Sequence, residues 1–334
     1  MADGHEPAFP GWSARIESTV ERMVVAYFGV QVRGAQAKDR ALAALGGVQR
    51  LLGASHGPTH RDIAHHVDAQ GDDNFVVVSY WLDASQFALW QAGSGYLAWW
   101  NDDERLQEEL GYFHEILTPS PAGFETLISD PQTLAGASAA LGATTAAPIQ
   151  EHGYWGGMRD RIARAQTERL SASGSPMLAQ SSDDGARKKV IGPDNLAMIR
   201  SGQDWSATAG DEREMYLRKV EPALRRGMAF LSNSGPEVGC YSNAYMRIID
   251  PNGDPRDATF GFSLWRSLGD LEGWSEHHPS HMAILGSFMN LIAKMDNKID
   301  VRLYHEVCVL RTDEQIYEYI NCHAQTGMLK YLAA

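Results

Sequence analysis

Two stretches of sequence decide the fold: FVVVSYW, residues 75–81, and TFGFSLW, residues 259–265. Both are rich in β-branched and aromatic residues, which is typical of strands. Each ends in a tryptophan, and in each half another tryptophan follows nine residues later. Further along the chain, GYFHEIL (residues 111–117) is similar to VRLYHEVCVL (residues 301–310). Each of these stretches follows the tryptophan pair of its own half. The sequence therefore predicts that one structural unit occurs twice.

Working outward, each half shows the order strand, helix, strand, strand, helix, strand. The first half has predicted strands at residues 23–33, 61–68, 75–81 and 111–117, and helices at 41–52 and 84–100. The second half has predicted strands at residues 195–203, 240–250, 259–265 and 301–310, and helices at 211–230, where Pro222 should introduce a kink, and 280–295. The predicted fold class is α+β: two duplicated ferredoxin-like (βαββαβ) units whose sheets face each other and enclose a barrel-like cavity.

Composition along the chain divides it into four parts. We expect an N-terminal segment over residues 1–22, a first unit over 23–133, a linker over 134–190 and a second unit over 191–334. The linker is rich in Ala, Gly, Ser and Thr. Within it, however, EHGYWGGMRDRIARAQ (residues 151–166) is dense in aromatic and arginine residues. Such an island inside a linker indicates a functional site.

Bulk composition disfavours several classes of protein. The 334 residues are 44% hydrophobic and 21% charged, which is ordinary for a globular chain. A net charge of −13 disfavours nucleic acid and anionic membranes as partners. The sequence has neither a long apolar run nor the basic and apolar regions of a signal peptide, so we expect a cytoplasmic protein. Cys240, Cys308 and Cys322 include no Cys-x-x-Cys pair, and we expect reduced, mostly buried thiols.

Twelve histidines raise the question of a metal site. His60, His65 and His66 lack a fixed ligand spacing, and adjacent residues of a strand point to opposite faces. His277 and His281 are four residues apart, but the proline between them indicates the start of a helix. For that pair a solvated helix cap is the better interpretation.

His114 and His305 differ from these, because each lies mid-strand in an apolar setting at the equivalent place of its unit. A core histidine and a haem or metal ligand both remain open for them. His323 follows at the end of the apolar stretch YEYINC. Two histidines on either side of one cavity would suit an axial ligand and a distal acid/base.

Longer blocks cover essentially the whole chain: FPGWSARIE, YFGVQVRG, QEHGYWGGMRDR, MIRSGQDW, GCYSN, WRSLGDLEGWSEHHPSH, RLYHEV and EYINCHAQTGM. In these blocks the chain resembles the haem-containing aldoxime dehydratases, the family of the aliphatic aldoxime and phenylacetaldoxime dehydratases. The resemblance implies a duplicated ferredoxin-like fold of the dimeric α+β barrel type, in agreement with the repeat. It also implies a lyase that converts an aldoxime, R-CH=N-OH, to a nitrile and water, with haem b as cofactor and the substrate nitrogen on ferrous iron.

The same resemblance implies roles for five residues. His305 of LYHEV is the implied axial ligand of the haem iron, and His323 of INCH is the implied distal acid/base. Ser201 of IRSGQDW is implied to hydrogen-bond the substrate hydroxyl. Arg161 of MRDR is implied to position the distal group, and Glu125 of FETL to pair with the distal histidine. Without the resemblance, a turn serine, a surface arginine and a helix N-terminal carboxylate are ordinary interpretations of the last three.

Several further expectations follow from the resemblance. His114 corresponds to the axial ligand in the other unit. Gly11 and Gly157 stand where larger residues can occur in the family, which affects pocket size and substrate preference. A homodimer is expected, with a small aldoxime as partner and an unidentified reductant. A haem peroxidase-like enzyme and a haem carrier remain alternatives on the same fold.

Overall fold

The computed structural model describes residues 4–34, 38–182 and 185–332. Residues 1–3, 35–37, 183–184 and 333–334 lie outside the described residues. They fall, in that order, in the predicted N-terminal segment, first unit, linker and second unit. The strands are β1 (Val24–Arg33), β2 (His60–Val67), β3 (Asp72–Trp81), β4 (Gly111–Leu117), β5 (Phe124–Ile128), β6 (Met177–Ser181), β7 (Arg187–Ile191), β8 (Leu196–Asp204), β9 (Cys240–Ile249), β10 (Pro255–Trp265), β11 (Arg302–Leu310) and β12 (Gln315–Ile320).

The helices lie between these strands. They are α1 (Lys38–Leu52), α2 (Ala84–Gly93), α3 (Tyr96–Asn101), α4 (Glu104–Gln107), α5 (Ala137–Leu141), α6 (Gly157–Arg161), α7 (Gly210–Met215), α8 (Glu221–Ser234), α9 (Leu268–His277), α10 (Pro279–Lys294) and α11 (Leu329–Leu332). A π-helical turn, η4 (Tyr216–Val220), joins α7 to α8. Short 3-10 turns are η2 (Pro121–Gly123), η3 (Ala163–Gln166), η5 (Gly235–Val238) and η6 (Thr312–Glu314).

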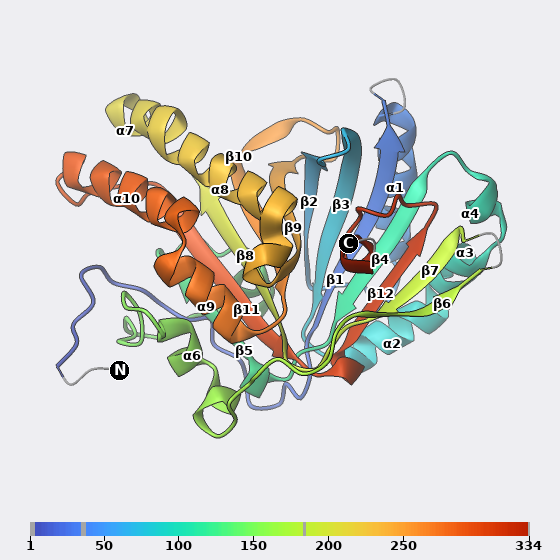
Figure 1. The fold of residues 1–334 in the computed structure, drawn as a ribbon, viewed down its shortest axis with the longest axis horizontal. Coiled ribbons are helices and arrows are strands. Elements are labelled where there is room, and N and C mark those ends of the chain that lie inside the picture. Colours follow the sequence, from blue (N-terminus) through green and yellow to red (C-terminus); the bar gives the residue numbers. More distant parts are fainter. Residues whose placement is uncertain (1–3, 35–37, 183–184, 333–334) are drawn as a thin grey trace.

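The strands of the described chain form one antiparallel sheet in the order β5-β11-β8-β10-β9-β2-β3-β1-β4-β12-β7-β6. The sheet is strongly curled, with α8 and α10 on one side of the molecule and α1 and α2 on the other (Figure 1). Within it, the first half contributes β2-β3-β1-β4 and the second half contributes β9-β10-β8-β11, each in the strand order of a ferredoxin-like unit. That the two units arose by duplication stays a prediction.

One strand that follows each unit along the chain pairs with a strand of the other unit. β5 follows the first unit along the chain but pairs with β11, whereas β12 follows β11 and pairs with β4. The sequence analysis did not predict β5, β12, β6 or β7, because these short strands carry no repeat signal. The exchange ties the predicted units into one sheet, and their boundaries in the sequence stay a prediction.

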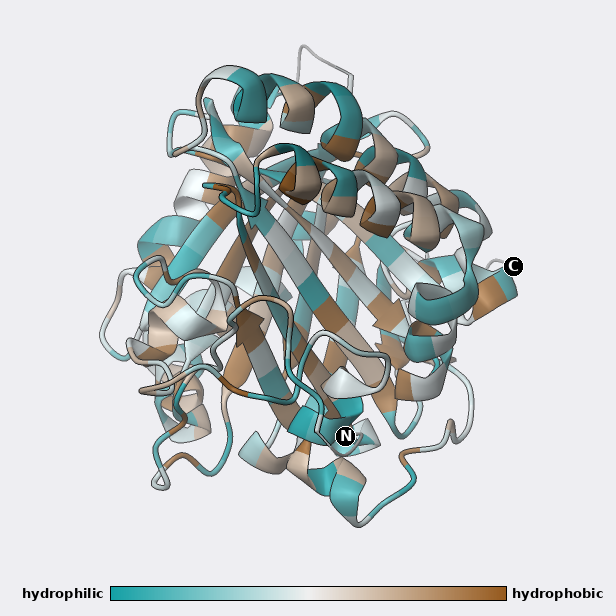
Figure 2. Cartoon of the chain, turned by 90° about the vertical axis from the view of Figure 1, so that its left-hand side faces the viewer, coloured by the Kyte–Doolittle hydropathy of each residue, from teal (hydrophilic) through white to brown (hydrophobic). Residues whose placement is uncertain are grey.

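The core lies on both faces of the central strands. Nearly every residue of β1 and β3 is buried, as expected for strands that are covered on both sides. Inside the curl, Tyr27 of β1 stacks on Phe262 of β10 with their ring centroids 3.9 Å apart, so the two halves share one apolar interior. Burying such a side chain contributes roughly 1.5–3 kcal/mol. Figure 2 shows hydrophobic residues along the strands and mixed hydrophilic and hydrophobic turns on the helices above them.

Local sequence explains where the predicted helices differ from the observed ones. The helix predicted over residues 84–100 is divided into α2 and α3 at Gly95, whose φ of +82° is easily adopted by glycine. The helix predicted over residues 211–230 contains the π-helical turn η4, and Pro222 follows it in the first turn of α8. Proline is tolerated there because its missing N–H needs no partner in the first turn.

Two further expectations concern whole-chain properties. Cys240, Cys308 and Cys322 are free and buried, as predicted. In the described part of the chain, no helix combines the length and apolar character needed to cross a membrane.

Candidate functional site

The site begins with two neighbouring strands, β8 and β11. Ser201 of β8 lies directly opposite His305 of β11, and Glu125 of β5 lies opposite Val307, two residues further along β11. Paired residues and residues two apart along a strand point to the same face of a sheet. Ser201, His305 and Glu125 therefore share one face. Val307 packs on that face in the apolar cluster formed with α8 and α9.

Arg161 joins this group from α6, inside the island that the sequence analysis singled out. Its Nε and Nη2 donate to the two carboxylate oxygens of Glu125 at 2.7 and 3.0 Å, and its Nη1 donates to the carbonyl of Glu151 at 2.7 Å. The Arg161 and Glu125 side chains are only 7% and 1% exposed. Burial raises the pKa of Glu125, and the neighbouring guanidinium opposes that rise. Arg161 is thus buried in an ion pair with Glu125 and is not a solvated surface residue.

His305 lies beside this ion pair without a hydrogen-bond partner among the described residues, and so does the hydroxyl of Ser201. Burial, together with the positive charges of Arg161 and His281, lowers the pKa of His305 to about 4. The imidazole is therefore neutral near pH 7. Two polar groups that face the same way without partners provide positions for a bound molecule.

His281 completes the arrangement from the first turns of α10. The distance from its Nδ1 to the carbonyl oxygen of Ser275 is 2.6 Å. Because a carbonyl oxygen only accepts, Nδ1 carries the proton and Nε2 keeps a free lone pair. The ring lies 4.8 Å from Trp274 and 6.2 Å from Trp155, and burial lowers its pKa.

The sequence analysis missed His281 because it interpreted the histidines near Pro279 as a solvated cap. That role belongs to His278, whose side chain accepts from the Ser280 N–H, while His277 is exposed at the end of α9. A signal was present: the partly buried Ile284 follows His281 by three residues, at helical spacing.

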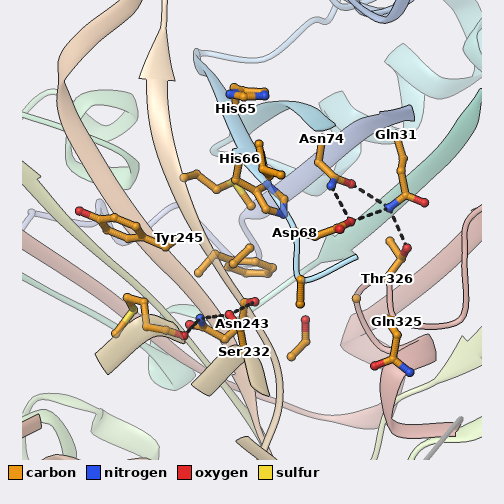
Figure 3. Close-up of a pocket in the computed structure, with 18 of the residues that line it drawn as sticks. Gln31, His65, His66, Asp68, Asn74, Ser232, Asn243, Tyr245, Gln325 and Thr326 are labelled. Carbon is orange, nitrogen blue, oxygen red and sulfur yellow. Dashed lines mark hydrogen bonds between the residues drawn. The ribbon is translucent and has the colours of Figure 1, made fainter. Parts of the chain in front are cut away.

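The structure does not bring His323 to this group. Its Nε2 lies 2.9 Å from Asp68, its Nδ1 accepts from the Gln325 N–H at 3.1 Å, and its own N–H donates to Gln31 at 3.2 Å. The expected pairing of Glu125 with His323 is wrong, because Glu125 binds Arg161 and His323 binds Asp68 of the β2–β3 turn. Figure 3 shows Asp68 beside Gln31, Asn74 and Thr326, the part of the molecule to which His323 belongs.

The remaining expectations concern His114 and two glycines. His114 is buried, with Nδ1 2.8 Å from the Tyr96 hydroxyl. A Cβ atom at Gly11 would lie 3.0 Å from Leu127, which pairs with His305 across the sheet. A Cβ atom at Gly157 would lie 3.3 Å from Arg161. Both glycines therefore permit close packing around the site, and their effect on substrate preference stays a prediction.

Comparisons with known proteins identify the class to which this fold and this site belong. The chain belongs to the haem-containing dehydratase family, whose model matches residues 26–328. It is 42% identical to the aliphatic aldoxime dehydratase of Rhodococcus globerulus over 331 residues, which cover 99% of the chain and 93% of that protein. It is 32% identical to the phenylacetaldoxime dehydratase of Bacillus sp. (strain OxB-1) over 341 residues, with 99% and 94% coverage.

A solved structure agrees with these relatives. The crystal structure of an aldoxime dehydratase in complex with butyraldoxime superposes with a TM-score of 0.94 at 41% identity, and the match covers 99% of this chain and 91% of that one.

The described residues fit a haem group. A neutral imidazole nitrogen with a free lone pair is a common axial ligand of haem iron, and Nε2 of His281 meets that description. Histidines that bind metals usually donate their other N–H to a carbonyl or carboxylate, as His281 does to Ser275. His305, Ser201 and the Arg161–Glu125 pair supply the polar groups that a reaction beside the iron requires.

Proposed function

We propose that this chain is a haem-dependent lyase that dehydrates aldoximes to nitriles and water. Its relatives at 32% to 42% identity are named as aliphatic aldoxime and phenylacetaldoxime dehydratases, and a structural relative was crystallised with butyraldoxime. The observation that carries the proposal is the pair of histidines, His281 and His305, one held by a carbonyl and one without a partner beside Ser201.

In this proposal His281, in place of His305, would hold the haem iron. The reason is the hydrogen bond from its Nδ1 to Ser275, which fixes the ring and directs Nε2 away from the α9–α10 turn. His305 has no comparable partner among the described residues. An axial ligand held by a carbonyl loses less orientational freedom when it binds the iron than an unsupported ring would.

His305 takes the acid/base role that the sequence analysis gave to His323. Bound haem would supply ferrous iron that binds the oxime nitrogen and donates electron density toward the N–O bond. Hydroxide leaves nitrogen poorly, so the neutral ring of His305 accepts the proton from carbon and, as imidazolium, passes a proton to the departing oxygen. The oxygen leaves as water, and the ring returns to its neutral form. Ser201, directly opposite His305, holds the oxime hydroxyl in place by a hydrogen bond.

Arg161 and Glu125 act through their neighbours. Their bidentate ion pair joins α6 to β5, the strand beside His305. Because Arg161 lowers the pKa of His305, the charged imidazolium is a strong acid when it forms, and the neutral ring is the resting form. The preferred aldoxime, the reductant and a homodimeric assembly remain parts of the proposal that rest on the resemblance.

The test is an anaerobic assay of nitrile formation by haem-loaded, dithionite-reduced protein with butyraldoxime and phenylacetaldoxime, against a haem-only blank. We expect nitrile from the parent protein and none above the blank from His305→Ala. Absence of nitrile from the parent with both substrates, with haem bound, would contradict the proposal.

The assignment of the two histidines has its own test. His281→Ala is expected to lose the haem absorption band, and His281→Gly to regain it with added imidazole, whereas His305→Ala keeps the band. Loss of haem in His305→Ala with retention in His281→Ala would restore His305 as the axial ligand.

A further inference from the structure

The second tryptophan of each repeated pair has a different partner in each half. Trp90 of α2 donates from its Nε1 to the carbonyl of Leu51, near the end of α1, at 2.8 Å. Trp274 of α9, its counterpart in the second half, donates from its Nε1 to the hydroxyl oxygen of Ser280 at 3.2 Å. Ser280 directly precedes His281 in α10. Trp274 is therefore bonded to the turn of helix that carries the proposed axial ligand.

Trp274 contacts the start of α10 in three ways. Its carbonyl accepts from the N–H of His278, the N-cap of α10, at 3.0 Å. Its indole N–H binds Ser280, and its ring centroid lies 4.8 Å from that of His281. The next residue, Ser275, supplies the carbonyl that accepts from Nδ1 of His281. All these contacts act at the corner where α9 is followed by α10 (Figure 1).

Ser280 connects Trp274 to the cap of α10. The N–H of Ser280 donates to Nδ1 of His278 at 3.3 Å, which caps the first turn. Because Nδ1 accepts there, it carries no proton, and the Ser280 hydroxyl donates to the same atom at 2.8 Å. The ring of His278 stacks on Phe230 of α8, with the centroids 4.2 Å apart. The chain from Trp274 through Ser280 to His278 therefore fixes the first turn of α10 against both α9 and α8.

Trp274 is itself fixed to the sheet. It is buried, and its ring centroid lies 5.6 Å from that of Trp265 at the end of β10. Nε1 of Trp265 donates to the hydroxyl of Ser263 on the same strand at 2.8 Å, so a rotation of that ring would break a buried hydrogen bond. Both tryptophans belong to the apolar cluster that contains Val307 of β11. The sheet thus determines where Trp274 lies, and Trp274 determines where α10 begins.

We propose that Trp274 is a positioning residue for His281, and that it fixes the direction of the imidazole through Ser280 and through its own ring. The inference rests on the proposed role of His281 as the ligand that would hold the haem iron. Groups that orient a ligating histidine influence the strength of its bond to the metal and the reduction potential of the iron. Trp274 would therefore influence haem retention through His281.

The experiment compares Trp274→Phe with Trp90→Phe in the haem-loaded protein. Both variants lose one indole hydrogen bond and keep an aromatic ring, but of the two tryptophans Trp274 is the one that contacts His281. Release of haem to excess apomyoglobin measures haem retention. The iron–histidine stretching band in the resonance Raman spectrum of the reduced protein measures the axial bond, and urea unfolding measures stability.

We expect Trp274→Phe to hold haem about 10- to 100-fold less tightly than the parent, the usual cost of losing an outer partner of a metal ligand, and to shift the iron–histidine band. Trp90→Phe should release haem at the parent rate with an unchanged band, although both variants should unfold at lower urea concentration. Equal haem release and equal bands in the two variants would overturn the inference.

Ser280→Ala tests the hydrogen bond without changing either ring. It should shift the iron–histidine band in the same direction as Trp274→Phe, and Ser280→Thr, which keeps a hydroxyl, should restore it. The two changes combined should have less than the sum of their single effects, because they remove one shared hydrogen bond. Ser287→Ala is the control, since it removes a hydroxyl that donates to Ala283 within α10. A band in Ser280→Ala that matches that of Ser287→Ala would contradict the proposed path through Ser280.

His281→Ala separates this inference from the proposed function. Loss of haem from His281→Ala, with no effect of Trp274→Phe beyond that of Trp90→Phe, would overturn the positioning role alone. Retention of haem and of the iron–histidine band in His281→Ala would show that another histidine holds the iron, and both proposals would fail.

Discussion

Strands β4 and β11 occupy equivalent places in the two halves, but the histidine of β4 has hydrogen-bond partners and the histidine of β11 has none among the described residues. His114 of β4 is 3% exposed. Its Nδ1 lies 2.8 Å from the Tyr96 hydroxyl, its Nε2 lies 3.3 Å from Glu318, and its ring lies 4.1 Å from that of Trp100. Both nitrogens are satisfied, so this histidine is part of the core.

His305 of β11 has different neighbours at the same register positions. Where Phe28 of β1 lies opposite His114, Ser201 of β8 lies opposite His305. Where Glu318 of β12 pairs with His114, Leu127 of β5 pairs with His305. Around His305, the alkyl side chain of Leu127 thus takes the place of the Glu318 carboxylate, and the Ser201 hydroxyl takes the place of an aromatic ring.

The two halves place a histidine at the same position of a similar strand, but only His114 of β4 has neighbours that satisfy its ring. At the corresponding positions around His305 the neighbours are Ser201 and Leu127. The helices differ as well, because α3 brings Tyr96 and Trp100 onto His114, whereas α10 brings a second histidine, His281.

The largest expected effect tests the difference between the two histidines directly. His305→Ala should reduce nitrile formation by about 100- to 10,000-fold, the usual contribution of a positioned acid/base, with the haem band retained. His114→Ala should leave turnover per haem unchanged and lower the free energy of unfolding instead, because it removes a buried ring and leaves the Tyr96 hydroxyl without its partner. Turnover in steady-state assays and unfolding in urea separate the two outcomes. Equal loss of turnover in both variants would remove the distinction.

The next effect concerns the buried ion pair beside the site. Arg161→Met should lower the free energy of unfolding by about 3–5 kcal/mol, because it leaves the Glu125 carboxylate buried without its charge partner. Arg40→Met is the matched control, since Arg40 and Glu109 are 58% and 82% exposed and such pairs contribute about 0–1 kcal/mol. Urea titrations of both variants measure the difference. Similar losses would mean that burial of the Arg161 pair is not what makes it costly to break.

A third effect concerns the glutamates that follow the two histidines. Burial raises the pKa of Glu115 to about 7 from 4.5, and it has no guanidinium partner, whereas Glu306 lies near Arg200, which opposes the rise. Because the folded state binds this proton more tightly than the unfolded state, stability is highest below pH 4.5 and is lost as the pH rises to about 7. The loss amounts to about 3 kcal/mol.

Glu115→Gln should therefore unfold at higher urea concentration than the parent at pH 8 and at about the same concentration at pH 4.5. Glu306→Gln is the comparison from the other half, and it should not be stabilised at pH 8 because it removes a carboxylate that the nearby charge of Arg200 stabilises. A gain for Glu115→Gln that is independent of pH would show that titration of this carboxyl is not the cause.

The repeat in the sequence predicted most of the strands and helices. The strands that it did not predict share one physical feature. β1, β3 and β4 were predicted within a few residues because their apolar runs are local. β5 and β12 were missed because each is short and pairs across the two halves, which no local pattern records.

The candidate site was predicted only in part, again because a local sequence pattern does not record contacts between distant segments. Arg161, Glu125 and Ser201 lie together although they are far apart in the sequence, but they lie with His305 and not with His323 as expected. The resemblance placed the distal role on His323, and sequence order alone does not show that the loop after β12 turns toward Asp68 of the first half. The hydrogen bond between His281 and Ser275, which points to the axial ligand, exists only in the folded helix pair.

The smallest effect sharpens the comparison at the residue opposite each histidine. Ser201→Ala should lower kcat/KM by about 10- to 100-fold, the usual cost of one hydrogen bond to a substrate, and should leave stability unchanged. Stability is kept because the Ser201 hydroxyl has no protein partner among the described residues to be left unsatisfied. Ser201→Thr, which retains a hydroxyl, should recover part of the loss.

Phe28→Ala makes the matching change in the first half, where the ring packs against Trp90 and Tyr96. It should cost about 3–5 kcal/mol of unfolding free energy through the cavity it leaves, with turnover per folded molecule unchanged. Steady-state kinetics and urea unfolding on the two variants then form a two-by-two comparison. If Ser201→Ala destabilised the fold as Phe28→Ala does, the serine would be a structural residue, and the two histidine environments would differ less than their contacts indicate.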